Sequence, residues 1–449
     1  MGKVKIGIVS LGCAKNLTDT ELMVGKLVQS GYEITNQENL ADILIINTCG
    51  FIEKAKQESI NTILELSQQK QIGNCKGLII TGCLSQRYKD QLIAEMPEID
   101  GIIGTNEYHL IDQVVEKVLT GEKYEGDYSR DYLFSYNEPN YRLTPQHYAY
   151  LKVAEGCDNR CSFCVIPSIR GEYRSYPFDY LISKAEKMGK EGVKEINLIA
   201  QDTSRYGLDL YKSLQLPELI KRIAQISDLE WIRILYCYPT RITDELIQTI
   251  KNENKVCKYL DIPLQHCNDE ILARMNRPIN KQEIVNLIKK LREAIPNLVL
   301  RTSFIVGFPG ETEEQFAELL DFMEKMRFER VGIFTYSQEE DTAAGNMAGQ
   351  ISEAVKQERY RKAMELQKRI SFELNKEKLN KEYAVLVEGK LASKKYNYWG
   401  RSQDDAPEVD GRIFLKGKNI TPGKIVKVKI TGFDNYDLLG EMVENESGK

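Results

Sequence analysis

The stretch YLKVAEGCDNRCSFC, residues 150–164, joins an apolar run to three closely spaced cysteines. The run predicts a strand, and Cys157, Cys161 and Cys164 follow it with the spacing C-x3-C-x2-C. Three thiolates arranged in this way can each bind one iron of a [4Fe–4S] cluster and leave the fourth iron open for a substrate or cofactor. A structural zinc site is the alternative, although it normally needs a fourth Cys or His.

Strand and helix patterns alternate on the C-terminal side of this stretch. Strands are predicted at 149–155, 194–200, 231–237, 258–262, 298–306 and 330–335, with helical patterns such as 178–190 and 281–294 between them. Six βα units predict an open or partial barrel, in which sites gather at the carboxyl ends of the strands. A charged helix over 352–380 is expected to close this domain.

The N-terminal region has the same alternation. Strands at 5–11, 42–48 and 77–82 precede helices at 18–30, 52–69 and 85–95, and this order predicts an α/β domain with a parallel sheet. Thr18 and Glu21 have the spacing of a capping box, so the first helix is expected to begin there. The polar, tyrosine-rich segment 122–145 predicts a linker or an ordered arm.

Three further cysteines follow the three N-terminal strands. Cys13, Cys49 and Cys83 each come at a strand end beside a glycine, so they are expected to meet at one edge of the sheet. A second [4Fe–4S] cluster with an open iron is one interpretation. Packing as small buried hydrophobic side chains is the alternative.

The remaining cysteines and the histidines give weaker signals. Cys75 precedes its strand and is expected at the opposite edge of the sheet. Packing is the favoured interpretation of three others, Cys237, Cys257 and Cys267. The chain has only three histidines, and none has metal-ligand spacing, so acid–base catalysis by histidine is a weak hypothesis.

Polar and glycine residues follow other strands of the predicted barrel and are expected near its site. Those at the strand ends are Gln201, Pro263 and Gln265, and those in GFPGET (307–312) are Gly307, Gly310 and Glu311. Glycines there would let the backbone approach a ligand closely. An ordinary turn followed by a helix cap, Thr312 with Gln315, is the alternative for GFPGET.

The last seventy residues change to short alternating strands separated by turns, which predicts a small β-barrel. Residues 381–449 carry twelve Lys and Arg against eleven Asp and Glu, so no strong phosphate-binding surface is indicated. The acidic run QDDAPEVDG, residues 403–411, favours a basic protein partner, with a solvated loop as the alternative.

Length and composition set wider bounds. A chain of 449 residues is expected to form several domains, and its net charge of −5 argues against wholesale coating of nucleic acid. The apolar run near the N-terminus is too short for a signal peptide, and no later stretch has the roughly 18 apolar residues of a membrane span. A cytoplasmic protein with no membrane partner is expected, and its ten cysteines are then expected to be metal ligands, catalytic thiols or buried hydrophobic side chains more than structural disulfides.

The combination of motifs along the chain resembles the radical S-adenosylmethionine methylthiotransferases. The motifs are SLGCAKN, NTCGFIEKAKQES, TGCLSQRY, YLKVAEGCDNRCSFCVIPSIRG, NLIAQDTSRYG, YLDIPLQH, FIVGFPGET, FTYSQEE and GRSQDDAPEVDG. The wording of SLGCAKN and GCDNRCSFCVIPSIRGEYRS is closer to the branch that modifies an aspartate of ribosomal protein S-twelve than to the branch that modifies an adenosine of transfer RNA.

The resemblance implies three domains: an N-terminal methylthiotransferase domain (1–121) and, after a linker (122–145), a radical S-adenosylmethionine domain (146–378) and a TRAM β-barrel (379–449). It implies two [4Fe–4S] clusters, one on Cys157, Cys161 and Cys164 and an auxiliary one on the N-terminal triad, with S-adenosylmethionine as both methyl donor and radical source. An electron donor such as flavodoxin or ferredoxin is also implied.

Two rival functions remain open from the residues alone. A transfer-RNA methylthiotransferase would use the same chemistry and would need a positive groove that leads to its site. A non-catalytic iron–sulfur electron carrier is the other, but carriers normally have fully ligated clusters, and both cysteine sets here have three members.

Overall fold

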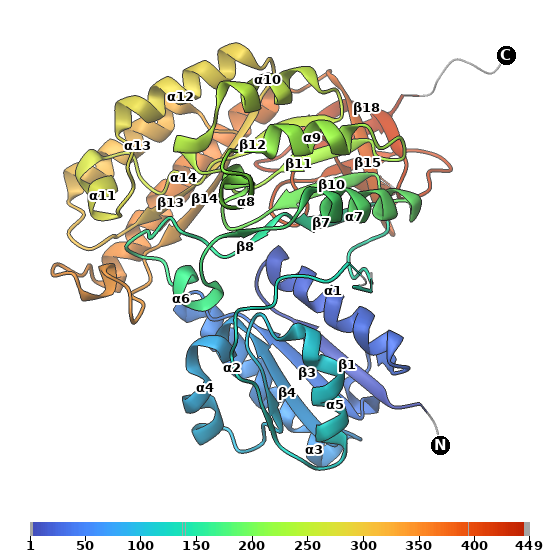
Figure 1. Cartoon of the computed structure of the whole chain (residues 1–449). Coiled ribbons are helices and arrows are strands. Elements are labelled where there is room, and N and C mark those ends of the chain that lie inside the picture. Colours follow the sequence, from blue (N-terminus) through green and yellow to red (C-terminus); the bar gives the residue numbers. More distant parts are fainter. Residues whose placement is uncertain (1–2, 137, 140, 394, 444–449) are drawn as a thin grey trace.

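The computed structural model describes residues 3–136, 138–139, 141–393 and 395–443. Three units follow one another along the chain: an N-terminal parallel sheet with its helices, a central open barrel of parallel strands, and a C-terminal closed β-barrel (Figure 1). The predicted fold class is therefore confirmed. The expected boundary segment 122–145 and the C-terminal 379–449 each include positions outside the described residues.

The N-terminal sheet has six parallel strands in the order β2-β1-β3-β4-β5-β6. Its strands are β1 (Lys5–Ser10), β2 (Glu33–Thr35), β3 (Ile43–Thr48), β4 (Gly77–Gly82), β5 (Gly101–Ile102) and β6 (Tyr124–Glu125). Its helices are α1 (Ala14–Gln29), α2 (Glu53–Ser67), α3 (Gln69–Ile72), α4 (Cys83–Glu95) and α5 (Ile111–Leu119). The central strands are buried and apolar on both faces: alternate residues of β3 and β4 pack in one hydrophobic cluster with α1 and α5 and in another with α2 and α4.

The first helix begins four residues earlier than the capping-box pattern predicts. Cys13 is its N-cap, with extended backbone, and Ala14 is its first residue. Thr18 lies inside the helix, where its hydroxyl donates to the carbonyl of Lys15, and Glu21 accepts backbone N–H groups of Leu143 and Thr144. The predicted capping box was wrong because both side chains have partners elsewhere, and one of them fastens the arm 122–145 to α1.

The central sheet is parallel throughout and open, in the order β14-β13-β12-β11-β10-β7. Its strands are β7 (Tyr148–Lys152), β10 (Glu195–Ile199), β11 (Trp231–Ile234), β12 (Val256–Asp261), β13 (Val299–Val306) and β14 (Arg330–Thr335). The helices between and after them are α6 (Ile166–Arg170), α7 (Phe178–Lys190), α8 (Leu208–Tyr211), α9 (Leu216–Ala224), α10 (Asp244–Asn252), α11 (Asp269–Arg274), α12 (Lys281–Ala294), α13 (Glu313–Met326) and α14 (Glu353–Lys376). A short hairpin of β8 (Ala154–Glu155) and β9 (Arg174–Ser175) brackets the three-cysteine loop.

The C-terminal barrel closes in the order β15-β16-β17-β19-β18. Its strands are β15 (Glu382–Lys390), β16 (Tyr398–Arg401), β17 (Ile413–Lys416), β18 (Ile425–Phe433) and β19 (Leu438–Met442). It contacts the amino ends of the central strands, where Arg401 ion-pairs with Glu195 of β10 at 2.7 Å.

The structure of the acidic run 403–411 differs from both of its predicted roles, a docking site for a basic protein and a solvated loop. Asp405 is buried against Arg330 of β14, and Glu408 accepts the hydroxyls of Tyr148 and Tyr150 of β7. Asp410 accepts the hydroxyl of Tyr259 at 2.6 Å. The run is therefore not a freely solvated loop, and Asp405, Glu408 and Asp410 are not free to bind a basic partner, since they fasten the C-terminal barrel to the central one.

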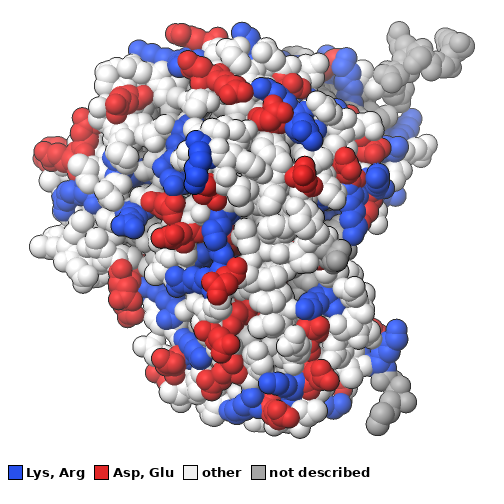
Figure 2. All heavy atoms as spheres, viewed as in Figure 1, with Lys and Arg blue, Asp and Glu red and all other residues white. Residues whose placement is uncertain are grey.

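Charge is mixed on the face of the molecule that Figure 2 shows. Figure 2 shows Lys and Arg interspersed with Asp and Glu over the face in view. Within the described residues, no helix has the length and apolarity needed to cross a membrane.

Candidate functional site

The first cysteine set lies at the carboxyl ends of the central strands. Cys157, Cys161 and Cys164 occupy the loop between β8 and α6, and all three are free, partly exposed thiols. The Cys157 N–H donates to the carbonyl of Gly171 at 3.1 Å and the Cys164 N–H to that of Cys161 at 3.1 Å. Gly156 has φ 75°, and a Cβ there would lie 2.0 Å from the carbonyl oxygen of Glu172. Glycine is therefore required for the loop to close on itself.

A polar cluster holds the outer part of this loop. Asn159 donates to Asp202 at 2.9 Å, and Arg241 donates to the same carboxylate at 2.6 Å and to the Asn159 amide oxygen at 2.7 Å. Asp202 follows β10, and Arg241 follows β11. Residues that follow two neighbouring strands thus fix the conformation of the cysteine loop.

A guanidinium contacts the thiols directly. Arg277 Nη1 lies 3.7 Å from Cys161 Sγ, while its Nη2 donates to the carbonyl of Pro263 at 2.6 Å and its plane stacks on Tyr238. Burial raises the pKa of Cys157 to about 11 and that of Cys164 further. A cationic metal group would favour the thiolate form that burial disfavours.

The second cysteine set lies at the edge of the N-terminal sheet. Cys13, Cys49 and Cys83 follow β1, β3 and β4, which are neighbours in the sheet. A Cβ on Gly12 would lie 2.8 Å from the Cβ of Cys49, and a Cβ on Gly50 would lie 2.8 Å from the Cα of Leu84. The three loops are therefore packed against one another, as expected from the strand order.

The charges around this second set differ from thiol to thiol. Burial acts to raise the pKa of Cys13, but the Lys15 ammonium, the Arg170 guanidinium and backbone N–H groups at the start of α1 outweigh it, so that pKa is lowered. Burial raises the pKa of Cys49, and it raises that of Cys83 to about 12. A thiolate is therefore favoured at the α1 N-terminus before any metal binds.

Arg170 connects the two cysteine sets. It ends α6, the helix that follows Cys164, and its Nη2 lies 3.8 Å from Cys83 Sγ and 2.5 Å from the amide oxygen of Asn16. Its guanidinium also donates to Glu155 at 2.8 Å and to Asp19 at 3.0 Å.

This contact belongs to a buried ionic network across the domain boundary. Lys152 of β7 donates to both carboxylates of the network, Asp19 on α1 and Glu155 on β8. A second link lies nearby, where Glu339, after β14, pairs with Arg87 of α4 at 2.7 Å and with Lys56 of α2 at 3.2 Å. The N-terminal domain is thus held over the mouth of the central barrel.

The donor sets fit iron–sulfur clusters better than single ions. In the part of the chain that the structure describes, no three His, Cys, Asp or Glu side chains are grouped as the ligands of one metal ion. A [4Fe–4S] cluster does not need its ligands to meet at one ion, because each thiolate binds a different iron. The first set offers three free thiols on one loop and the second offers three on neighbouring loops, and each lies beside a guanidinium that balances the charge of a thiolate-bound cluster.

The other predicted residues lie at the same barrel mouth. Gln265 has φ 75° and bridges to Phe304 of β13, and Gln201 directly follows β10. A Cβ on Gly307 would lie 2.4 Å from Cγ of Lys356, and Gly310 has φ 70°, a conformation that side chains rarely adopt, so the protein's own structure already favours glycine at both positions. Their approach to a cofactor stays a prediction.

Glu311 has partners within the protein. Its carboxylate is buried and accepts hydrogen bonds from Arg359, at 3.1 Å, and from the Gly307 N–H, and it also contacts His266. These contacts hold the loop 307–311 in its observed conformation. The predicted cap of the next helix is confirmed, since Thr312 and Gln315 form a capping box at the start of α13.

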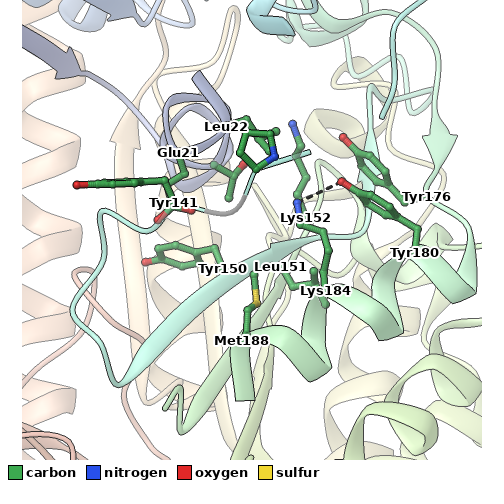
Figure 3. Close-up of a pocket in the computed structure, with 12 residues that line it drawn as sticks. Glu21, Leu22, Tyr141, Tyr150, Leu151, Lys152, Tyr176, Tyr180, Lys184 and Met188 are labelled. Atoms are coloured by element: carbon green, nitrogen blue, oxygen red, sulfur yellow. Dashed lines mark hydrogen bonds between the residues drawn. The ribbon is translucent and has the colours of Figure 1, made fainter. Parts of the chain in front are cut away.

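A small cavity lies behind the mouth, between α1, the arm and α7 (Figure 3). Tyr180 and Lys184 of α7 hydrogen-bond at 3.1 Å on one side, and Glu21 of α1 lines the opposite side. None of the cysteines lines this cavity.

Sequence reasoning missed the charged residues that organise the site. Lys15, Arg170 and Arg277 have no spacing pattern of their own. For Lys15 and Arg170, the only signal in the sequence is that they lie near the cysteine motifs. Arg277 has no such signal, because it lies 113 residues beyond Cys164 in the chain.

Comparisons with known proteins agree with this architecture. The chain matches the models of Uncharacterized protein family UPF0004 over residues 5–104, the Radical SAM superfamily over 151–323 and the TRAM domain over 381–443. A solved structure of the radical S-adenosylmethionine methyltransferase TsrM from Kitasatospora setae is similar, with TM-score 0.57, 12% identity and 77% of each chain covered. At that identity, the likeness concerns the fold.

Curated relatives cover nearly the whole chain. The proteins named "Ribosomal protein uS12 methylthiotransferase RimO" from Lachnoclostridium phytofermentans and Desulforamulus reducens are 50% and 51% identical over 97% and 98% of this chain and 99% of their own length. The one from Geobacter sulfurreducens is 50% identical over 98% of this chain and 99% of its own.

Proposed function

Because this chain belongs to the RimO family of ribosomal protein uS12 methylthiotransferases, we propose that it adds a methylthio group to the β-carbon of an aspartate in uS12. It is a radical S-adenosylmethionine enzyme that uses [4Fe–4S] clusters. The observation that carries the proposal is the pairing of two free three-cysteine sets at one domain boundary, in a chain about 50% identical to these relatives over nearly its full length.

We propose that Cys157, Cys161 and Cys164 hold the radical-generating cluster and that Cys13, Cys49 and Cys83 hold the auxiliary one. Support comes from the free thiols of both sets and from the guanidinium beside each. When bound, these cofactors supply the removal of hydrogen from an unactivated carbon and the methylthio group, which side chains alone cannot do.

The protein's own residues bind, orient and exclude water. Arg277 and Arg170 place positive charge at one thiol of each set. The Asp202 carboxylate fixes the first cysteine loop through Asn159. The first turn of α1 lies at the barrel mouth, where Ala14 and Leu17 pack against the buried cluster that includes Tyr150 and Leu235 and so limit the access of solvent to the barrel interior.

We propose that S-adenosylmethionine lies against the strand ends beside Cys157. The residues proposed to contact it are Gln201, Pro263, Gln265, Gly307 and Gly310, with Glu311 shaping the loop. The functional units proposed are 1–121, the arm 122–145, 146–378 and 379–449.

The proposed substrate is uS12, either alone or within the small ribosomal subunit. The reaction also needs a one-electron donor, for which flavodoxin or ferredoxin is the proposed class. The proposed location is the cytoplasm, where ribosomal proteins would be available.

One experiment tests the substrate. The full chain, anaerobically reconstituted with iron and sulfide, is given S-adenosylmethionine and a reductant with either purified uS12 or bulk transfer RNA. Mass spectrometry is expected to find a methylthio group on one aspartate of uS12 and none on the RNA. Modified RNA beside unmodified uS12 would refute the proposal, and a chain without S-adenosylmethionine is the control.

A further inference from the structure

Lys15 is a buried cation without a carboxylate partner. Within the described residues, four lysines are less than a tenth exposed: Lys15, Lys152, Lys356 and Lys378. The last three each pair with carboxylates, whereas no ion pair or hydrogen bond of the Lys15 ammonium is found in the described part of the chain. Buried lysines are almost always paired with carboxylates, and the anionic neighbour here, the Cys13 thiolate, is itself proposed to bind iron, so a carboxylate from a ligand could pair with this ammonium.

The ammonium is held at a defined place. Its Nζ lies 3.4 Å from the centroid of the Tyr236 ring, which is a close cation–π contact. Tyr236 has φ 62°, its N–H donates to Asp261 at 3.1 Å, and its carbonyl accepts the N–H of Thr203 at 2.9 Å. These bonds fix the tyrosine and therefore the lysine above it.

This place lies between the two cysteine sets. Lys15 is two residues beyond Cys13 on the N-terminal side. On the barrel side, Tyr236 is two residues before Tyr238, which stacks on Arg277, the residue that donates to Cys161. A substrate carbon that receives a group held at one set and loses hydrogen at the other must reach this region.

The chemistry of an aspartate fits a single lysine here. The carboxylate is one bond from the β-carbon, so a group that binds the carboxylate also fixes the carbon that reacts. An ammonium on a side chain that is only 5% exposed binds a carboxylate more strongly than it would in water. It would not bind a neutral asparagine side chain with comparable strength.

We propose that Lys15 binds the carboxylate of the target aspartate and so determines which side chain is modified. The proposal rests on the proposed function, because it takes the substrate to be an aspartate of uS12. Lys15 is then a specificity residue for the reaction, in addition to being a counter-charge for the Cys13 thiol.

The test compares Lys15→Met with wild type on two substrates. These are uS12 itself and uS12 in which the modified aspartate, located by mass spectrometry, is replaced by Asn. Wild type is expected to favour the aspartate protein by roughly 100-fold in kcat/KM, because a buried charge pair is lost with Asn. Lys15→Met is expected to lose about that factor on the aspartate protein, so the selectivity falls to near one.

Two controls separate this role from a structural one. Iron content and the electron paramagnetic resonance spectrum of Lys15→Met are expected to match wild type, and Lys15→Arg is expected to restore part of the selectivity. Lys26→Met, on the same helix and paired with Asp112 at 3.3 Å, is expected to behave as wild type.

Two results would overturn the proposal: unchanged Asp-over-Asn selectivity in Lys15→Met, or loss of iron from that variant, which would make the lysine only a cluster counter-charge. Wild type that leaves uS12 unmodified would instead refute the proposed function.

Discussion

The central barrel meets a neighbour at each end, and the two junctions use charge differently. The mouth junction, at the carboxyl strand ends, joins the N-terminal domain through Lys15, Asp19, Lys152, Glu155 and Arg170. The base junction, at the amino strand ends, joins the C-terminal barrel through Glu195, Arg233, Glu388 and Arg401.

At the base every one of these charges is paired. Glu195 is fully buried between Arg233 at 2.8 Å and Arg401 at 2.7 Å, and Arg401 also binds Glu388. At the mouth, Arg170 and Arg277 lie beside thiols instead of carboxylates alone, and Lys15 has no carboxylate partner among the described residues. Because unpaired buried charge is costly in a protein interior, the end that retains it is the end where a ligand is expected.

The largest expected effect separates the mouth from the rest of the molecule. Replacing Cys157, Cys161 and Cys164 together by Ala should abolish 5′-deoxyadenosine formation, because that set is proposed to hold the radical-generating cluster. Replacing Cys13, Cys49 and Cys83 together should abolish methylthio transfer but leave cleavage of S-adenosylmethionine. Iron analysis should find about eight irons per chain in wild type and about four in either triple variant.

Changing Cys75, Cys237 and Cys257 together to Ala is the matched control, because these buried thiols lie outside both sets. Full iron content is expected for that variant. Eight irons in the Cys13, Cys49, Cys83 variant would contradict the auxiliary site.

Most of the fold, and the two cysteine sets, could be predicted from the sequence. Strand runs such as 77–82 are continuous and apolar because both faces of a parallel strand are buried, and a cysteine after such a run must lie at a known edge. The C-x3-C-x2-C loop needs no tertiary information at all, because its ligands are local.

The charged partners could not be predicted in the same way. Arg170 contacts Asn16, 154 residues away, and nothing in either local pattern specifies that meeting. The acidic run 403–411 was misjudged because composition does not distinguish a carboxylate in water from one paired with a buried arginine such as Arg330. The start of α1 was predicted wrongly because Glu21 accepts hydrogen bonds from the arm 122–145 and does not cap the helix.

The second prediction tests the mouth network. Arg170→Met should destabilise the folded chain by about 3–5 kcal/mol, because Asp19 and Glu155 remain buried with Lys152 alone to balance them. Chemical denaturation would measure the loss, and hydrogen exchange should localise it to α1 and α6.

Lys221→Met removes an exposed pair with Glu245 and serves as the control, for which little change is expected. Equal destabilisation by the two variants would mean that the mouth network contributes no more than a surface pair.

A smaller effect is expected from one hydrogen bond at the base. Tyr259→Phe removes the hydroxyl that donates to Asp410 at 2.6 Å and leaves the ring in place over Arg233. The expected cost is about 1.5–3 kcal/mol, since the acceptor is a buried carboxylate. Because the base holds no cysteine of either set, iron content and 5′-deoxyadenosine formation should be unchanged in this variant. Loss of either at ordinary temperature would show that the two ends of the barrel are not independent.

The smallest effect is expected from mild acid at the base. Burial acts to raise the pKa values of Glu195, Glu388 and Asp405, but their arginine partners, with His147 at Glu388 and Lys378 at Asp405, outweigh it and hold all three below the ordinary range. A carboxyl with a depressed folded pKa contributes stability that is complete above its unfolded pKa, near 4, and is lost as the pH falls through the folded value. The base junction should therefore keep its contribution to stability between pH 8 and pH 5 and lose it only below about pH 4.

Hydrogen exchange of the β15 and β16 amides across this pH range would measure that contribution. Glu195→Gln is the comparison, because that variant leaves Arg233 and Arg401 without their shared carboxylate at every pH. Release of these strands already at pH 5–6 would mean that the carboxylates are not the charges that hold the base together.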